Sequence, residues 1–200
     1  MAKLEHEEQL NSIFANVNEW LKFAEAKNFG LMTLNAGVIF GISQISHEKT
    51  SLIINLCYYL IIPFASISFL VSLISVFPIL SKIDRQIKNR NDEFVDNMVR
   101  NFIKTFSNWI DKEGQIKNIN FYGYLSSLKL KDFEKEFLSK VKSEIKFSDY
   151  EKDISTQILY NSRITHLKYQ LFKIAAFFFL CGIVLPIIVL GIISIIKLIR

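Results

Sequence analysis

The sequence from Ile174 to Ile196 reads IAAFFFLCGIVLPIIVLGIISII and contains no Asp, Glu, Lys, Arg or His. At a rise of about 1.5 Å per residue, a helix of this length crosses a hydrocarbon core about 30 Å thick. Gly182, Pro186 and Gly191 lie inside the run, and membrane helices tolerate such residues better than soluble helices do. A buried soluble helix is the alternative, but it rarely stays apolar on every side over this length. We therefore predict a membrane-spanning helix.

The segment before this run, Ile154–Lys173, contains neither proline nor glycine. Nothing in it would stop a helix, so we expect the spanning helix to begin well before the bilayer. A single rod from Ile154 to Ile196 would then couple a water-exposed part of the chain to the membrane.

Two further stretches are uncharged, Asn28–Ser46 and Leu52–Leu80. The first is polar for a membrane segment because it contains Asn28, Asn35 and Gln44, whereas the second is long enough to span with tilt. The predicted fold class is an all-α membrane protein with three transmembrane helices. A small, mainly helical module lies between the second and third spans.

The predicted organisation has four parts. Residues 1–27 form an amphipathic helix, in which Leu10, Ile13, Val17 and Ala24 recur at helical spacing. Residues 28–80 form a transmembrane hairpin, residues 81–169 a sensor or assembly module, and residues 170–200 the third span. Within the module we expect an amphipathic helix over residues 94–110, an aromatic, turn-like stretch over 118–128 with a short extended segment as one interpretation, and a solvated helix over 131–147.

Small residues recur on two of the membrane segments. Gly37 and Gly41 have the four-residue spacing of close helix packing, although chance spacing is the alternative. Ser68 and Ser72 share one face of the next segment. That face suits either helix packing or a wet pathway, and we favour packing because serine alone is a weak signal for a pore.

The charge distribution predicts an orientation. Lys82, Arg85, Lys88 and Arg90 directly follow the second uncharged run, and basic residues mark the cytoplasmic side. The N-terminus and the central module are therefore expected in the cytoplasm and Arg200 outside, in a multi-pass protein. The acidic start of the chain does not resemble a signal peptide.

The sequence offers little chemistry for catalysis or metal binding. It has no glycine-rich phosphate loop, no paired cysteine motif and no His-Glu-x-x-His motif, and Cys57 and Cys181 lie in apolar runs. We therefore predict no enzyme activity, no catalytic residue, no metal and no cofactor. The net charge of +5 is better explained by anionic lipid than by nucleic acid, which we do not expect as a partner.

One polar set is a candidate for ligand binding or coupling. Asn161, Arg163 and Lys168 precede the last membrane run with little acidic compensation nearby in the sequence, and Lys27 and Asn28 begin the first run. Juxtamembrane Lys and Arg usually bind lipid phosphates or extend to the interface. The alternative is that they bind an anionic ligand such as a nucleotide phosphate.

Three segments resemble the transmembrane effectors of Pycsar-type bacterial anti-phage defence: Asn18–Asn35 (NEWLKFAEAKNFGLMTLN), Asn118–Phe133 (NINFYGYLSSLKLKDF) and Gln157–Ala175 (QILYNSRITHLKYQLFKIA). They occur in order over most of the chain. The family has an acidic residue after its glycine, where this chain has Tyr124 after Gly123.

The resemblance implies a partner cyclase that makes a cyclic pyrimidine mononucleotide, cUMP or cCMP, on infection. It implies that the cytoplasmic part responds, that the effector assembles as a homo-oligomer, and that the inner membrane loses integrity so that growth stops. Two alternatives from other classes are a structural membrane scaffold for a partner protein and a small channel or transporter. The effector predicts nucleotide-dependent toxicity, the scaffold predicts none, and the channel predicts a leak without any signal.

Overall fold

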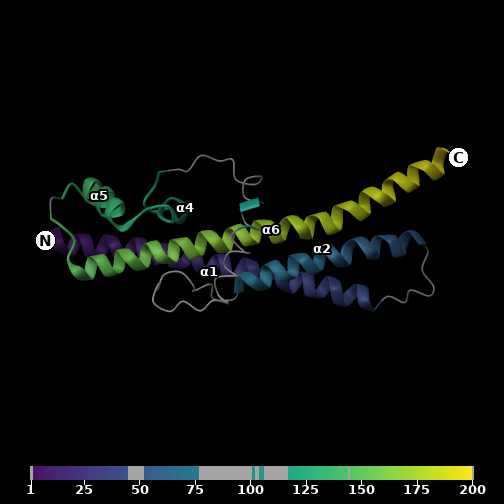
Figure 1. Ribbon diagram of the computed structural model, residues 1–200, viewed down its shortest axis with the longest axis horizontal. Coiled ribbons are helices and arrows are strands. Elements are labelled where there is room, and N and C mark those ends of the chain that lie inside the picture. Colours follow the sequence, from purple (N-terminus) through teal and green to yellow (C-terminus); the bar gives the residue numbers. More distant parts are fainter. Residues whose placement is uncertain are drawn as a thin grey trace. The chain divides into compact units, whose positions relative to one another are not determined.

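The structure is a computed structural model that describes residues 2–44, 52–76, 101, 104–105, 117–143 and 145–199. Figure 1 shows its helices, which are α1 (Ala2–Ser43), α2 (Leu52–Val76), α4 (Tyr122–Leu125), α5 (Leu130–Val141) and α6 (Asp149–Ile199). No strand occurs among the residues in these ranges. The predicted all-α class is therefore confirmed. The basic cluster at Lys82–Arg90 and most of the helix expected over residues 94–110 lie outside the described residues.

The chain divides into two compact units, which we describe separately. The first unit comprises Met1–Ala26 and Ser107–Gln170, and the second comprises Lys27–Phe106 and Leu171–Arg200. Helices α1 and α6 each contribute residues to both units. The rod predicted over Ile154–Ile196 is thus part of one helix, α6, of 51 residues.

The first unit has a hydrophobic core between α1, α6 and the segment from α4 to α5. The apolar face predicted for the N-terminal helix lies in this core, since Leu10, Val17 and Ala24 are fully buried. Phe133 and Phe137 of α5 pack against each other with ring centroids 6.1 Å apart, and both are at most 1% exposed. The apolar faces predicted from the sequence are therefore buried in the core of the first unit.

The interpretation of residues 118–128 as a short extended segment is wrong, because α4 forms there. Phe121 has an extended backbone (φ −105°, ψ 119°) and directly precedes the helix. Its ring lies over Gly123, where a Cβ atom would come within 2.5 Å of the ring. Glycine at this position therefore permits the tight turn from Phe121 into α4. The aromatic residues of this stretch do not by themselves reveal the turn.

The helix expected over residues 131–147 is shorter than predicted. Lys142 adopts a left-handed conformation (φ 55°) and ends α5, so that Phe147 returns to the core at 4% exposure. Helix α6 then starts with a capping box, in which Ser148 N and Oγ each lie 2.6 Å from Glu151 Oε2. Glu151 is buried and its other oxygen lies 3.5 Å from His6 Nδ1, which ties the start of α6 to the start of α1.

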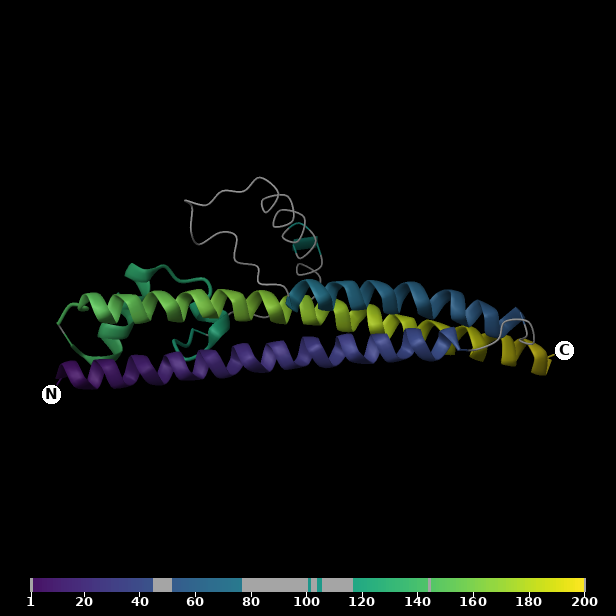
Figure 2. The ribbon, with the colours of Figure 1, turned by 90° about the horizontal axis from the view of Figure 1, so that it is seen from below.

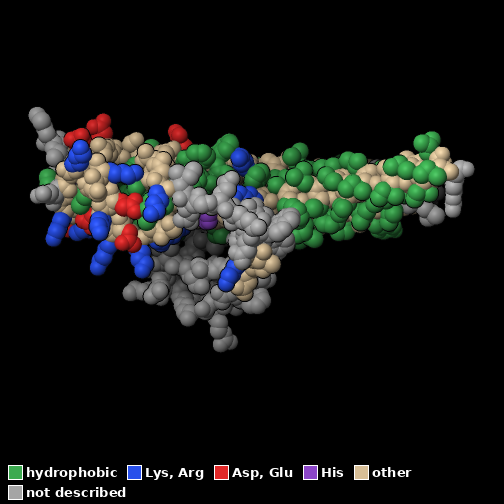
Figure 3. All heavy atoms as spheres, turned by 90° about the horizontal axis from the view of Figure 1, so that it is seen from above, with side chains coloured by type: hydrophobic (Ala, Val, Ile, Leu, Met, Phe, Trp, Pro, Cys, Tyr) green, Lys and Arg blue, Asp and Glu red, His purple; other side chains and the backbone are tan. Residues whose placement is uncertain are grey.

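In the second unit, the parts of α1 and α6 that belong to this unit lie beside α2 (Figure 2). Among the described residues, two helices are long and apolar enough to cross a membrane: α2 over Tyr58–Val76 and α6. Pro63 and Pro186 lie inside these helices without ending them. Their large apolar side chains are widely exposed, and Figure 3 shows this uncharged surface in green.

The remaining predicted span, which is the first along the chain, falls on α1. Its described uncharged part, Asn28–Ser43, is not among the two candidate spans. This part is short and contains Asn28, Thr33 and Asn35, which lower its hydropathy. The three-span arrangement therefore stays a prediction.

Candidate functional site

A chain of buried hydrogen bonds links α1, α2 and α6 in the second unit. Asn35 Nδ2 on α1 donates to Ser68 Oγ on α2 at 2.8 Å, and Ser68 Oγ donates to the backbone carbonyl of Ala175 on α6 at 2.7 Å. Asn35 and Ser68 are both fully buried. We call these two side chains and the Ala175 carbonyl the polar relay. Interhelical bonds of this kind contribute roughly 0.6–2 kcal/mol each in membrane proteins.

The polar relay leaves some hydrogen-bonding capacity unused. Asn35 Oδ1 and Ser72 Oγ are buried without a hydrogen-bond partner among the described residues, although Ser72 lies one helical turn beyond Ser68. Ser68 is therefore hydrogen-bonded between α1 and α6, and the favoured interpretation of its face as a packing surface stays a prediction. The neighbouring buried oxygens provide a polar strip inside an otherwise apolar unit.

The close helix contact predicted at Gly37 and Gly41 is not seen among the described residues. Gly37 and Gly41 are exposed, and a Cβ added at either would meet no described atom within 4 Å. They make no close packing contact with the described part of the chain, so their role in helix packing stays a prediction. The glycine at which helices do approach is Gly182, where a Cβ would lie 3.0 Å from Phe64 Cβ on α2.

In the first unit, two of the predicted site residues on α6 contact α1, in addition to the His6–Glu151 pair. Asn161 Nδ2 donates to Asn18 Oδ1 at 2.7 Å, and Lys168 Nζ lies 3.0 Å from Glu25 Oε1. Lys168 is 8% exposed. The expectation of little acidic compensation holds along the sequence but not in space, because Glu25 comes from a distant part of the chain.

Arg163 holds the backbone after α4. Its guanidinium donates to the carbonyl of Leu128 at 2.9 Å and to that of Ser126 at 3.4 Å. A planar fork suits two carbonyl acceptors at once. The position of Arg163 is thus accounted for by the folding of the α4–α5 connection.

The five predicted ligand-binding or coupling residues are divided between the two units. Asn161, Arg163 and Lys168 belong to the first, and Lys27 and Asn28 to the second. Lys27 Nζ lies 5.5 Å from the centroid of the Phe172 ring, a cation–π distance, and Asn28 is fully buried. Their joint role in ligand binding or coupling therefore stays a prediction.

No sequence pattern predicts the polar hollow that lies in the first unit. It has a volume of about 310 Å3 and lies between α1, the segment before α4 and α5. Its polar rim consists of Gln9, Ser12, Asn120 and Lys140. These residues belong to three separate segments whose proximity no local pattern encodes.

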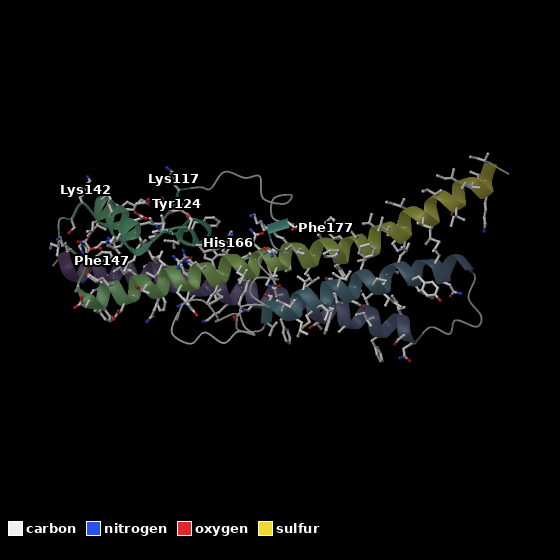
Figure 4. The ribbon with its side chains drawn as sticks, in the orientation of Figure 1. Lys117, Tyr124, Lys142, Phe147, His166 and Phe177 are labelled. Carbon is white, nitrogen blue, oxygen red and sulfur yellow. The ribbon has the colours of Figure 1, made fainter. Side chains whose placement is uncertain are left out.

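A polar pair joins α4 to α5. The Tyr124 hydroxyl donates to Glu136 Oε1, and this hydrogen bond raises the pKa of Tyr124 above its ordinary value of 10.0. The phenol therefore remains a protonated donor at physiological pH. Figure 4 labels Tyr124 on α4 beside this helix. Among the described residues, no group of three His, Cys, Asp or Glu side chains could hold a metal ion.

The fold and these contacts define a helical membrane protein with a charged unit and an apolar unit. The profile of the Pycsar effector protein domain matches residues 9–195. The chain therefore belongs to the Pycsar effector family and is a transmembrane effector of bacterial anti-phage defence. No curated protein and no solved structure matches it.

Proposed function

We propose that this chain is a cyclic-nucleotide-activated effector that impairs the inner membrane and thereby causes growth arrest or cell death. The observation that carries the proposal is the family match over residues 9–195, and the ligand we propose is cUMP or cCMP made by a partner cyclase. The chain itself performs no catalytic step in this scheme, and needs no metal or cofactor.

The second unit supports a switch between two packings. Burying polar groups in an apolar environment is costly unless they are hydrogen-bonded. The polar relay gives Asn35 Nδ2 and Ser68 Oγ hydrogen-bond partners in the packed form. If the helices separate, these groups need water or each other, which a homo-oligomer with a wet interior would supply. Activation then exchanges contacts inside one chain for contacts between chains.

Helices α1 and α6 support coupling between signal and membrane. Each helix has residues in both units. A shift of the part that lies in the first unit therefore acts on the same continuous helix that enters the second unit. A ligand shifts such an equilibrium only by its difference in affinity between the two states.

The proposal is tested by reconstituting the full chain in liposomes with an imposed membrane potential and a potential-sensitive dye. With nucleotide on both faces, we expect cUMP or cCMP to cause depolarisation, whereas cAMP and protein-free liposomes should give none. A scaffold would leave the potential unchanged in every condition. A constitutive channel would dissipate it before nucleotide is added. Either result would overturn the proposal.

The proposed orientation has the N-terminus and the central module in the cytoplasm and three spans. Alkaline phosphatase is active only outside the inner membrane, so a fusion after Arg200 should be active and one after Arg90 inactive. With only the two spans of α2 and α6, a cytoplasmic central module would place residues 2–43 outside. A fusion before Ala2 should therefore also be inactive if three helices span, and active if two do.

A further inference from the structure

We propose that the polar hollow in the first unit is the nucleotide site, and that it takes a singly charged mononucleotide. This inference rests on the proposed function for its ligand class, while the location follows from the lining residues. The site differs from the juxtamembrane residues that the sequence singled out.

The hollow combines an apolar floor with a polar rim. Ile13, Ile119 and Phe137 form the floor and are at most 7% exposed, which suits the face of a flat ring. The rim residues Gln9, Ser12 and Asn120 are exposed and carry carboxamide and hydroxyl groups. Carboxamides can donate to and accept from the edge of a base at the same time.

The charge of the hollow favours a monoanion. Lys140 is its one cationic lining residue among those the structure describes, and none of these lining residues is acidic. A cyclic phosphodiester carries one negative charge and is matched by one ammonium group. Lys117 and Lys142, labelled in Figure 4, are also exposed and lie next in sequence to the lining segments.

The size of the hollow favours a small nucleotide. Its volume of about 310 Å3 is at the lower end of the range of roughly 300–1,000 Å3 for small-molecule sites. A pyrimidine mononucleotide has one ring fewer to place than a purine, so it makes the smaller demand on this volume.

The lining segments are held in place before any ligand binds. Asn16 Nδ2 on α1 donates to the Asn120 carbonyl at 3.0 Å, and Asn120 N donates to Asn118 Oδ1 at 2.9 Å. These bonds fix the Asn120 backbone against α1 where Asn120 lines the hollow. Preorganisation of this kind lowers the entropic cost of binding.

A ligand in this hollow would connect α1 to α5. Gln9 and Ser12 lie on α1, which continues to Ser43 and carries Asn35 of the polar relay. Binding therefore stabilises one position of α1 against α5, and that preference is what a switch needs. Helix α1, in addition to α6, then transmits the signal.

The test measures binding of cUMP, cCMP and cAMP to the full chain in nanodiscs by calorimetry. Lys140→Gln should raise the Kd of the preferred pyrimidine nucleotide about tenfold, since it removes a charge-assisted hydrogen bond. Lys135→Gln is the matched control, because Lys135 is also exposed on α5 but does not line the hollow. It should change Kd less than twofold.

A second variant separates base recognition from charge. Gln9→Leu keeps the net charge but removes a carboxamide, so it should weaken the preferred nucleotide about fivefold and reduce discrimination between cUMP and cCMP. Both replaced side chains are exposed, so the thermal midpoint of each variant should match that of the parent.

The outcomes distinguish this inference from the proposed function. If the parent binds and depolarises but Lys140→Gln and Gln9→Leu bind like the parent, the hollow is not the site and the proposed function stands. If Arg163→Lys alone abolishes binding at an unchanged thermal midpoint, the juxtamembrane site is correct instead. If the parent neither binds nor responds to any cyclic mononucleotide, the proposed function fails and this inference fails with it.

Discussion

Replacing Phe133 with alanine is expected to lower the free energy of unfolding of the first unit by about 3–5 kcal/mol. Phe133 is fully buried and packs against Phe137 in the core. Removing its ring leaves a cavity that α1, α5 and α6 cannot all fill, and it also removes an aromatic contact. Since domains of this size are only marginally stable, the loss would leave much of the unit unfolded.

The measurement is pulse proteolysis of the full chain in liposomes at increasing urea concentration. Ile145→Ala is the control, because Ile145 is 51% exposed and its truncation should change stability by no more than about 0.5 kcal/mol. Equal midpoints for the two variants would contradict the burial of Phe133. Loss of nucleotide-triggered depolarisation in Phe133→Ala alone would further connect the folded first unit to activity.

Replacing Gly182 with leucine is expected to separate α2 from α6 in the second unit. A Cβ at Gly182 would already lie 3.0 Å from Phe64 Cβ and 3.7 Å from the Ile61 carbonyl oxygen. Overpacking of a tight contact costs about 1–3 kcal/mol, and a leucine side chain here meets the backbone of α2 as well. The polar relay, which joins the same two helices through Ser68 and Ala175, would be strained in consequence.

Gly191→Leu is the matched control for this change. Gly191 lies on the same helix, and a Cβ there meets no described atom within 4 Å. The midpoint of unfolding in mixed micelles of increasing SDS content should fall for Gly182→Leu and stay close to the parent for Gly191→Leu. The same fall in both variants would mean that leucine disturbs the helix itself and that the α2–α6 contact is unimportant.

These two experiments address contacts that differ in how far the sequence foretold them. The burial of Leu10, Val17 and Phe133 follows from helical periodicity, because a repeated apolar face must be covered by something. The sequence also placed Ser68 on a packing face. It directed attention to Gly37 and Gly41, however, while Gly182 has the close contact, since spacing alone does not tell which glycine faces a neighbour.

The candidate site was the least predictable feature. The sequence suggested Asn161, Arg163 and Lys168 because they are polar residues next to a membrane run. In the structure each of these has a protein partner: the Asn18 side chain, backbone carbonyls after α4, and Glu25. A side chain that looks available in a sequence can be fully engaged in the fold.

The sequence by itself determined that the chain is all-helical, that its last part is a long apolar helix and that its N-terminal helix has one apolar face. These properties depend on residues within a few turns of each other, and periodicity reports them directly. Only the tertiary structure decided that Asn35 meets Ser68, that Asn18 meets Asn161 and that three segments enclose a hollow. The paired residues are 33 and 143 positions apart, so their contact depends on which helix faces pack together. That choice is made by the burial of many side chains at once, and no single segment encodes it.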